Sequence, residues 1–112
     1  NKLDESINIE TYINSKAGKI KNKTKKQIKN QLKKELTNKG FNYSLVNNLV
    51  DQLLLDFNVD ESKIIEKEFN KIYKRHYKTK ENNELKHFIK QRLYQKGFNI
   101  DDINNIINKN IV

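Results

Sequence analysis

One pattern occurs twice in this sequence, and the repetition limits the possible folds more than any other feature. Residues 32–51 align with residues 89–108 without a gap, at an offset of 57 positions. Eight of the twenty aligned pairs are identical, and most apolar positions recur in the same places. Self-similarity at a fixed spacing is the mark of tandem structural units. We therefore expect two copies of one small fold.

Each copy is expected to contain three helices. The chain has no proline and only three glycines, and strand patterns are absent. Ile28, Leu32 and Leu36 recur every four residues, which predicts an amphipathic helix. Gly40 falls just past the end of this helix, and Phe41 is placed to pack back on Leu36 as in a Schellman stop. We predict an all-α fold of tandem three-helix repeats in an elongated array, with a first repeat at 1–57 (helices about 6–16, 24–39 and 43–55) and a second at 58–112 (helices about 60–77, 83–96 and 100–110).

The third helix of each repeat is expected to follow an asparagine cap, Asn42 or Asn99. In the first repeat the predicted apolar face of this helix is Leu45, Leu49 and Leu53. Both third helices carry acidic residues and hardly a basic one, whereas the recognition helix of a helix-turn-helix protein lies among DNA phosphates. Sequence-specific DNA reading is therefore not expected.

Positive charge is concentrated in two blocks. Residues 16–39 hold ten lysines and one acidic residue, and residues 71–96 hold nine Lys or Arg and two acidic residues. The stretch 40–70 between them is acidic overall. This alternation predicts a surface that binds a polyanion, such as nucleic acid, or an acidic protein surface.

Helical spacing places most of these cations on the side of their helix that faces away from the apolar stripe. Lys71, Arg75 and Arg92 are expected closer to the margins of their stripes. Tyr94 points outward from its helix, from where it is able to stack on a base or fill a partner pocket. The candidate residues for binding DNA or a protein–DNA filament are Lys23, Lys25, Lys26, Lys29, Lys33, Lys34, Lys63, Lys67, Lys74, Lys78, Lys86, Lys90 and Tyr94.

No set of residues predicts catalysis. The absence of cysteine removes cysteine nucleophiles, thiolate metal ligands and disulfides. Glu84 and His87 form a single Glu-x-x-His, whereas a helical dimetal site needs two together with further carboxylates. His76 continues the inner stripe of its helix as a core or rim residue. We therefore expect no enzyme, metal, cofactor or small-molecule substrate, and because no apolar run is long enough to span a bilayer, no membrane partner.

The motifs occur in a familiar order. Leu-x-x-Lys-Gly-Phe is present at 36–41 and again at 93–98, the Asp-Glu-Ser of 4–6 is followed by Tyr12-Ile13, and the run 88–98 lies near the end. This arrangement resembles the RecX family of recombination regulators, over nearly the whole chain. Members usually have a further N-terminal three-helix repeat, so the resemblance implies that this chain is the C-terminal portion of such a protein.

The resemblance implies a cytoplasmic, non-catalytic regulator of the RecA recombinase. Such proteins lie along the groove of the RecA–single-stranded DNA filament and limit its growth or promote its disassembly, which modulates homologous recombination, DNA repair and the SOS response. The residues leave a second hypothesis open, a DNA-binding helical module without sequence specificity and without a recombinase partner. Under both hypotheses the affinity falls steeply as salt rises.

Overall fold

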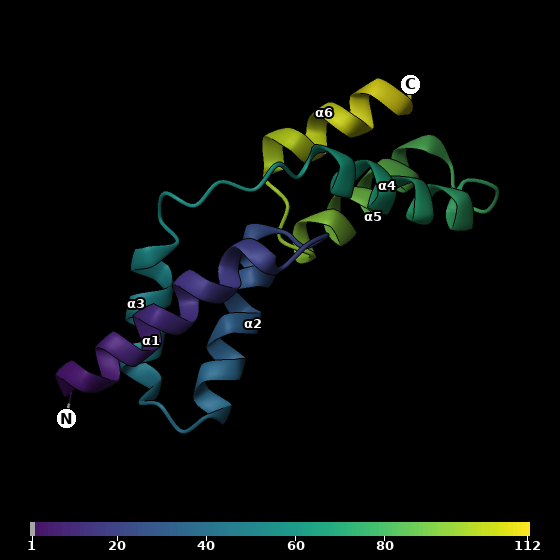
Figure 1. Cartoon of the computed structure of the whole chain (residues 1–112). Helices are drawn as coiled ribbons and strands as arrows, with labels where there is room; N and C mark the ends of the chain where they lie inside the picture. Colours follow the sequence, from purple (N-terminus) through teal and green to yellow (C-terminus); the bar gives the residue numbers. More distant parts are fainter. Residues whose placement is uncertain (1) are drawn as a thin grey trace. The chain divides into compact units, whose positions relative to one another are not determined.

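The computed structural model describes residues 2–112, in which helices joined by turns and loops are present and strands are absent. The predicted all-α class is therefore confirmed. No helix within these residues is both long and apolar enough to cross a membrane. The elements are α1 (Lys2–Lys16), the 3-10 turn η1 (Ala17–Lys19), α2 (Lys25–Asn38), α3 (Tyr43–Leu53), α4 (Ser62–His76), α5 (Asn82–Gln95) and α6 (Ile100–Asn110) (Figure 1).

The helices group into two compact units, Asn1–Val59 and Asp60–Val112, each with three α-helices. Five helices begin within about two residues of the positions expected from sequence, but α1 already includes Lys2 rather than starting near residue 6. Two acidic residues, Asp4 and Glu5, lie in its first turn, where negative charge stabilises the positive end of the helix dipole. Hydrophobic spacing alone missed this polar first turn.

The first unit is built around α3, which packs on both α1 and α2. The predicted apolar face of α3 was wrong by one position: Val46 and Val50 are fully buried, while Leu45, Leu49 and Leu53 pack at the edge of the core. Apolar residues come in adjacent pairs along this helix, and the second of each pair faces the other two helices. The buried core consists of Ile9, Ile13 and Ala17 from α1 and η1, Ile28, Leu32 and Leu36 from α2, and Val46, Val50 and Leu54 from α3 and its end.

The second unit has its own core, in which each of the three helices packs on the other two. The ring of Phe69 belongs to this core, and the rings of Tyr73 and Tyr77 stack after it along α4, with centroids 5.8 and 5.3 Å apart. The buried residues are Ile65, Phe69 and Ile72 from α4, Leu85, Ile89 and Leu93 from α5, Phe98, and Ile103, Ile107 and Ile111 from α6 and its end.

The turn after α2 confirms the predicted Schellman stop. Gly40 has a φ of 97°, in the left-handed region that side chains disfavour. Its N–H donates to the Thr37 carbonyl at 3.0 Å, and the Phe41 N–H donates to the Leu36 carbonyl at 3.3 Å. These bonds satisfy carbonyls at the end of the helix and reverse the chain toward α3.

The turn after α5 has the same construction. Gly97 has a φ of 98°. Its N–H donates to the Tyr94 carbonyl at 3.0 Å, and the Phe98 N–H donates to the Leu93 carbonyl at 3.3 Å. The expected caps of the following helices are also present: the Asn42 side chain accepts from the Leu45 N–H and that of Asn99 from the Asp101 N–H.

Replacing Gly40 with alanine tests the conformational demand of this turn. A Cβ at Gly40 meets no atom within 4 Å, so the cost comes from the backbone alone. We expect Gly40→Ala to lower the free energy of unfolding by about 1–2 kcal/mol in urea denaturation, because the left-handed conformation is strained for alanine. Gly18→Ala is the matched control, since Gly18 also has open space around it and lacks a positive φ. Equal effects of the two substitutions would contradict the assignment.

Candidate nucleic-acid interface

The lysines of α2 divide into two groups. Lys29 and Lys33 are half-buried, and their ammonium groups lie 3.8 and 2.9 Å from the Asp51 carboxylate of α3. The hydrogen bond from Lys33 and the charges of both lysines hold the pKa of Asp51 below its ordinary value. Lys26 and Lys34, by contrast, are exposed, and neither forms an ion pair within the part of the chain that the structure describes.

Two further predicted lysines, Lys25 at the first position of α2 and Lys23 just before its N-cap, make polar contacts within the unit. The Lys25 ammonium donates to the Leu55 carbonyl at 2.9 Å. The Lys23 ammonium donates to the Gln31 side chain at 2.8 Å. Together with Lys29 and Lys33, these residues link α2 to its surroundings, so Lys26 and Lys34 are the most available cations of this face.

Glu35 is the only acidic residue in the basic block 16–39, and its carboxylate is used inside the first unit. It accepts hydrogen bonds from the Tyr12 hydroxyl of α1 at 2.6 Å and from the Gln31 amide at 3.1 Å. The bond from Tyr12, followed by that from Gln31, lowers the pKa of Glu35, and the same contact raises the pKa of Tyr12 to about 12. Glu35 of α2 therefore connects this helix to α1 through Tyr12 and forms no ion pair with Lys26 or Lys34.

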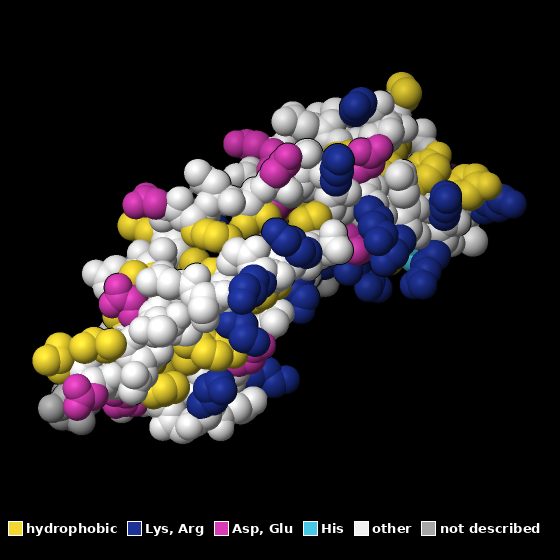
Figure 2. Space-filling view, viewed as in Figure 1, with side chains coloured by type: hydrophobic (Ala, Val, Ile, Leu, Met, Phe, Trp, Pro, Cys, Tyr) yellow, Lys and Arg dark blue, Asp and Glu magenta, His cyan; other side chains and the backbone are white. Residues whose placement is uncertain are grey.

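The exposed face of α4 carries a row of lysines that form no ion pair with the described residues. Lys63, Lys67, Lys74 and, just past the helix end, Lys78 are all exposed. Within residues 2–112 none of the four forms an ion pair, although the Lys78 ammonium lies 5.7 Å from the centroid of the Tyr77 ring. Dark-blue side chains gather on the right-hand side of Figure 2, over the second unit. We call Lys63, Lys67, Lys74 and Lys78 the α4 lysine row.

The predicted residues of α5 lie elsewhere on the second unit. Lys90 and the largely exposed Tyr94 line a shallow hollow of about 340 Å³ with His87, Gln91 and Ile100. Lys86 lies one turn before Lys90 and is half-buried. Helical geometry places this side of α5 opposite the side that bears Phe88 and Arg92.

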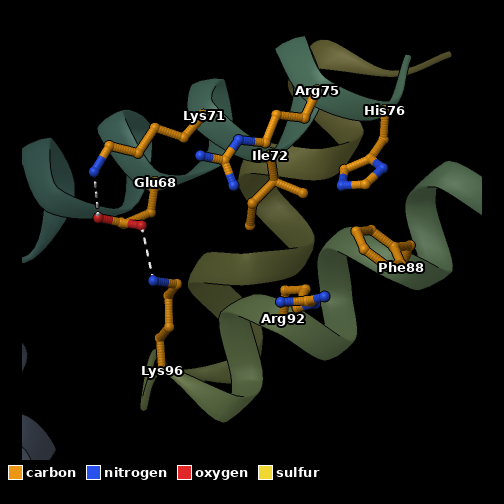
Figure 3. Close-up of a pocket in the computed structure, with 8 residues that line it drawn as sticks. All are labelled: Glu68, Lys71, Ile72, Arg75, His76, Phe88, Arg92 and Lys96. Atoms are coloured by element: carbon orange, nitrogen blue, oxygen red, sulfur yellow. Dashed lines mark ion pairs between the residues drawn. The ribbon is translucent and has the colours of Figure 1, made fainter. Parts of the chain in front are cut away.

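A pocket of about 250 Å³ opens on that opposite side, between α4 and α5 (Figure 3). The sequence prediction did not include it as a site. Its lining brings two arginines, two lysines and a histidine around one carboxylate, on a base formed by one aliphatic and one aromatic side chain. The residues are Glu68, Lys71, Ile72, Arg75 and His76 of α4 and Phe88, Arg92 and Lys96 of α5 and its C-terminal cap.

Glu68 occupies one wall of this pocket, where it pairs with two lysines. Its oxygens lie 3.0 Å from the Lys96 ammonium and 3.7 Å from that of Lys71. Burial alone would raise the pKa of Glu68, but the hydrogen bond from Lys96 and the charges of Lys96 and Lys71 lower it overall. The carboxylate is thus charged and holds both ammonium groups at the wall.

Sequence reasoning missed the pocket because it forms where the margins of two helices meet. Lys71, Arg75 and Arg92 were each expected at a stripe margin, but nothing in the sequence says which margin of α4 faces which margin of α5. One signal was present in the sequence: Arg92 follows Phe88 by four residues, a spacing at which helical side chains are neighbours. In the structure the Arg92 guanidinium lies 4.9 Å from the centroid of the Phe88 ring.

No metal site is evident in the described part of the chain, where no group of three His, Asp or Glu side chains is arranged to hold an ion. Comparison with family models, with curated proteins and with solved structures finds no match to this chain.

Stability in acid tests the role of Glu68. Because its pKa is lower in the folded protein than its ordinary value of 4.5, its stabilising effect is complete above that value and is lost as the pH falls through the folded-state pKa. We expect Glu68→Gln to lower the free energy of unfolding at pH 7 by about 1 kcal/mol or less. The variant should also lose less stability than the wild type between about pH 5 and about pH 2.

Urea denaturation across this range of pH measures the effect. Glu10→Gln is the control, because Glu10 is exposed on α1 and makes no hydrogen bond or ion pair with any described residue. It should leave the loss of stability in acid unchanged. An acid profile of Glu68→Gln identical to that of the wild type would show that the two lysines do not stabilise the charged carboxylate.

Proposed function

We propose that this protein regulates recombination by binding RecA–single-stranded DNA filaments and inhibiting the recombinase, either by blocking filament extension or by promoting disassembly. In this proposal it acts in the cytoplasm, without catalysis, as a member of the RecX-like regulators that its sequence resembles. Two lines of reasoning support it, one from the correspondence of the two units and one from the distribution of charge.

The correspondence of the two units supports tandem repeats. Buried residues of α2 and α3 recur 57 positions later in α5 and α6, and those of α1 recur 56 positions later in α4. The Schellman turns agree in their glycine φ angles, 97° and 98°, and in both hydrogen-bond lengths. The matched buried pairs are Ile9 and Ile65, Ile13 and Phe69, Ile28 and Leu85, Leu32 and Ile89, Leu36 and Leu93, Val46 and Ile103, Val50 and Ile107, and Leu54 and Ile111.

Repeated units suit a filament, because each copy is able to contact a different point along a periodic partner. Individually weak contacts on one chain are then linked, and the linkage raises the overall affinity. A single site for an isolated ligand would not need the duplication.

The observation that carries the proposal is the α4 lysine row. Like charges four residues apart in a helix, as in Lys63 and Lys67, destabilise it by about 0.2–0.5 kcal/mol per pair. None of these lysines forms an ion pair with a described residue, and the charge of Asp60 acts on Lys63 alone. A bound polyanion removes this repulsion, and single-stranded DNA within a recombinase filament offers a continuous line of phosphates.

The alternative function is a DNA-binding helical module without sequence specificity and without a recombinase partner. The same lysine row favours it, because phosphate contacts alone supply nonspecific binding to any nucleic acid. The two functions differ in whether the recombinase is affected at low dose.

The contribution of the α4 lysine row is tested by the triple variant Lys63→Gln, Lys67→Gln and Lys74→Gln. We expect its affinity for RecA–single-stranded DNA filaments to fall by about tenfold or more, because three phosphate contacts are lost. Fluorescence anisotropy with labelled DNA measures it. The control Lys109→Gln changes an exposed lysine outside both basic blocks and should bind within about twofold of the wild type. Equal losses in both variants would exclude the row as a defined surface.

RecA ATPase activity on single-stranded DNA separates the two functions. A filament regulator should inhibit ATP hydrolysis even when its concentration is far below that of the DNA binding sites, because each bound molecule stops extension or starts disassembly of a whole filament. A simple DNA-binding module should inhibit only when the DNA is saturated. Inhibition confined to saturating protein would contradict the proposed function and favour the alternative.

A further inference from the structure

The pocket between α4 and α5 has more positive charge than its own carboxylate balances. Lys71 and Lys96 share Glu68, as described above, whereas Arg75 and Arg92 form no ion pair among the described residues. Both arginines belong to the lining, and they reach it from different helices (Figure 3). The pocket therefore contains two guanidinium groups, one from each helix, whose charge no described carboxylate pairs with.

Its size suits a small anion rather than a whole organic ligand. The volume of about 250 Å³ lies below the roughly 300–1,000 Å³ of typical small-molecule sites. Guanidinium groups match phosphate oxygens especially well, because their planar fork of N–H donors makes paired, charge-assisted hydrogen bonds. Two guanidinium groups on different helices suit an oxyanion whose oxygens point in several directions, such as phosphate. A carboxylate has only two oxygens, and both lie in one plane.

The aromatic side chain of the pocket is not available for a nucleobase. The ring of Phe88 lies 4.4 Å, centroid to centroid, from the ring of His76. The Lys80 ammonium and the Arg92 guanidinium lie over the same ring, at 4.8 and 4.9 Å from its centroid. Because these groups surround the ring, stacking of a base on Phe88 is excluded, and the site is suited to recognise phosphate without regard to base identity.

We propose that the α4–α5 pocket is a phosphate-binding site, in which Arg75 and Arg92 hold the oxyanion. Lys71 and Lys96, positioned at the wall by Glu68, add positive charge around it. The phosphate belongs either to a nucleic-acid backbone or to a free phosphate ion. The site is independent of the proposed recombinase partner, and its test contains neither recombinase nor, in its first part, DNA.

The first experiment titrates the isotope-labelled full chain with potassium phosphate, against potassium chloride at equal ionic strength and pH, and follows backbone amide and arginine Nε–H NMR signals. We expect saturable shifts at α4 and α5 with phosphate and none with chloride. In the double variant Arg75→Gln and Arg92→Gln the apparent affinity should fall by about tenfold or more. The equal-charge control Lys19→Gln and Lys109→Gln should retain it, since neither lysine lines the pocket.

A single variant keeps the test valid if the double variant is unstable. Arg92 packs over Phe88, but Arg75 has no ring contact or ion pair within the described residues, so Arg75→Gln should fold normally and still weaken phosphate binding. Circular dichroism melting checks the fold of each variant. Absence of phosphate-dependent shifts at α4 and α5, or equal weakening in the lysine control, would overturn the site.

Two further ligands identify the source of the anion. A 5′-hydroxyl oligothymidine of about eight nucleotides should displace phosphate from the pocket if the backbone of a strand is the natural ligand. If the oligonucleotide shifts other residues and leaves bound phosphate in place, the site is one for the free ion. Glutamate at equal ionic strength represents an acidic protein surface, and binding as strong as that of phosphate would overturn the assignment to phosphate.

Discussion

The surfaces that we propose to bind anions depend on lysine and arginine side chains that form no ion pair with the described residues. Three acidic residues in or near the basic blocks have partners on another helix: Glu35 accepts from Tyr12, Asp51 pairs with Lys33, and Glu68 pairs with Lys96 as well as with Lys71. These carboxylates join helices to one another within a unit. The cations that remain, on the exposed face of α4 and in the α4–α5 pocket, are the basis of both proposals.

Local sequence signals determined most of the secondary structure. Leu36, Gly40 and Phe41 specify the end of α2 through a backbone conformation that few residues other than glycine adopt, and the same signal recurs after α5. Asparagine caps mark the starts of α3 and α6. These features were predictable because each depends on residues within one or two helical turns.

Features that depend on how helices face one another were not predictable in the same way. The buried face of α3 falls on Val46 and Val50 because it is set by two neighbouring helices, and hydrophobic spacing does not distinguish between adjacent leucines and valines. Lys29 and Lys33 have the same periodicity as free surface lysines, yet Asp51 lies on a different helix and pairs with both. The α4–α5 pocket likewise depends on which helix margins meet.

The salt dependence of filament binding tests the central claim, that uncompensated lysines bind a polyanion, most directly. The equilibrium constant K for binding of the full chain to RecA–single-stranded DNA filaments would be measured at several salt concentrations. Each phosphate contacted contributes a slope of about −0.7 in a plot of log K against log salt. The account predicts a slope of about −2 or steeper for the wild type, and one shallower by about 2 when Lys63, Lys67 and Lys74 are replaced by glutamine. A slope near zero, or the same slope in both proteins, would contradict it.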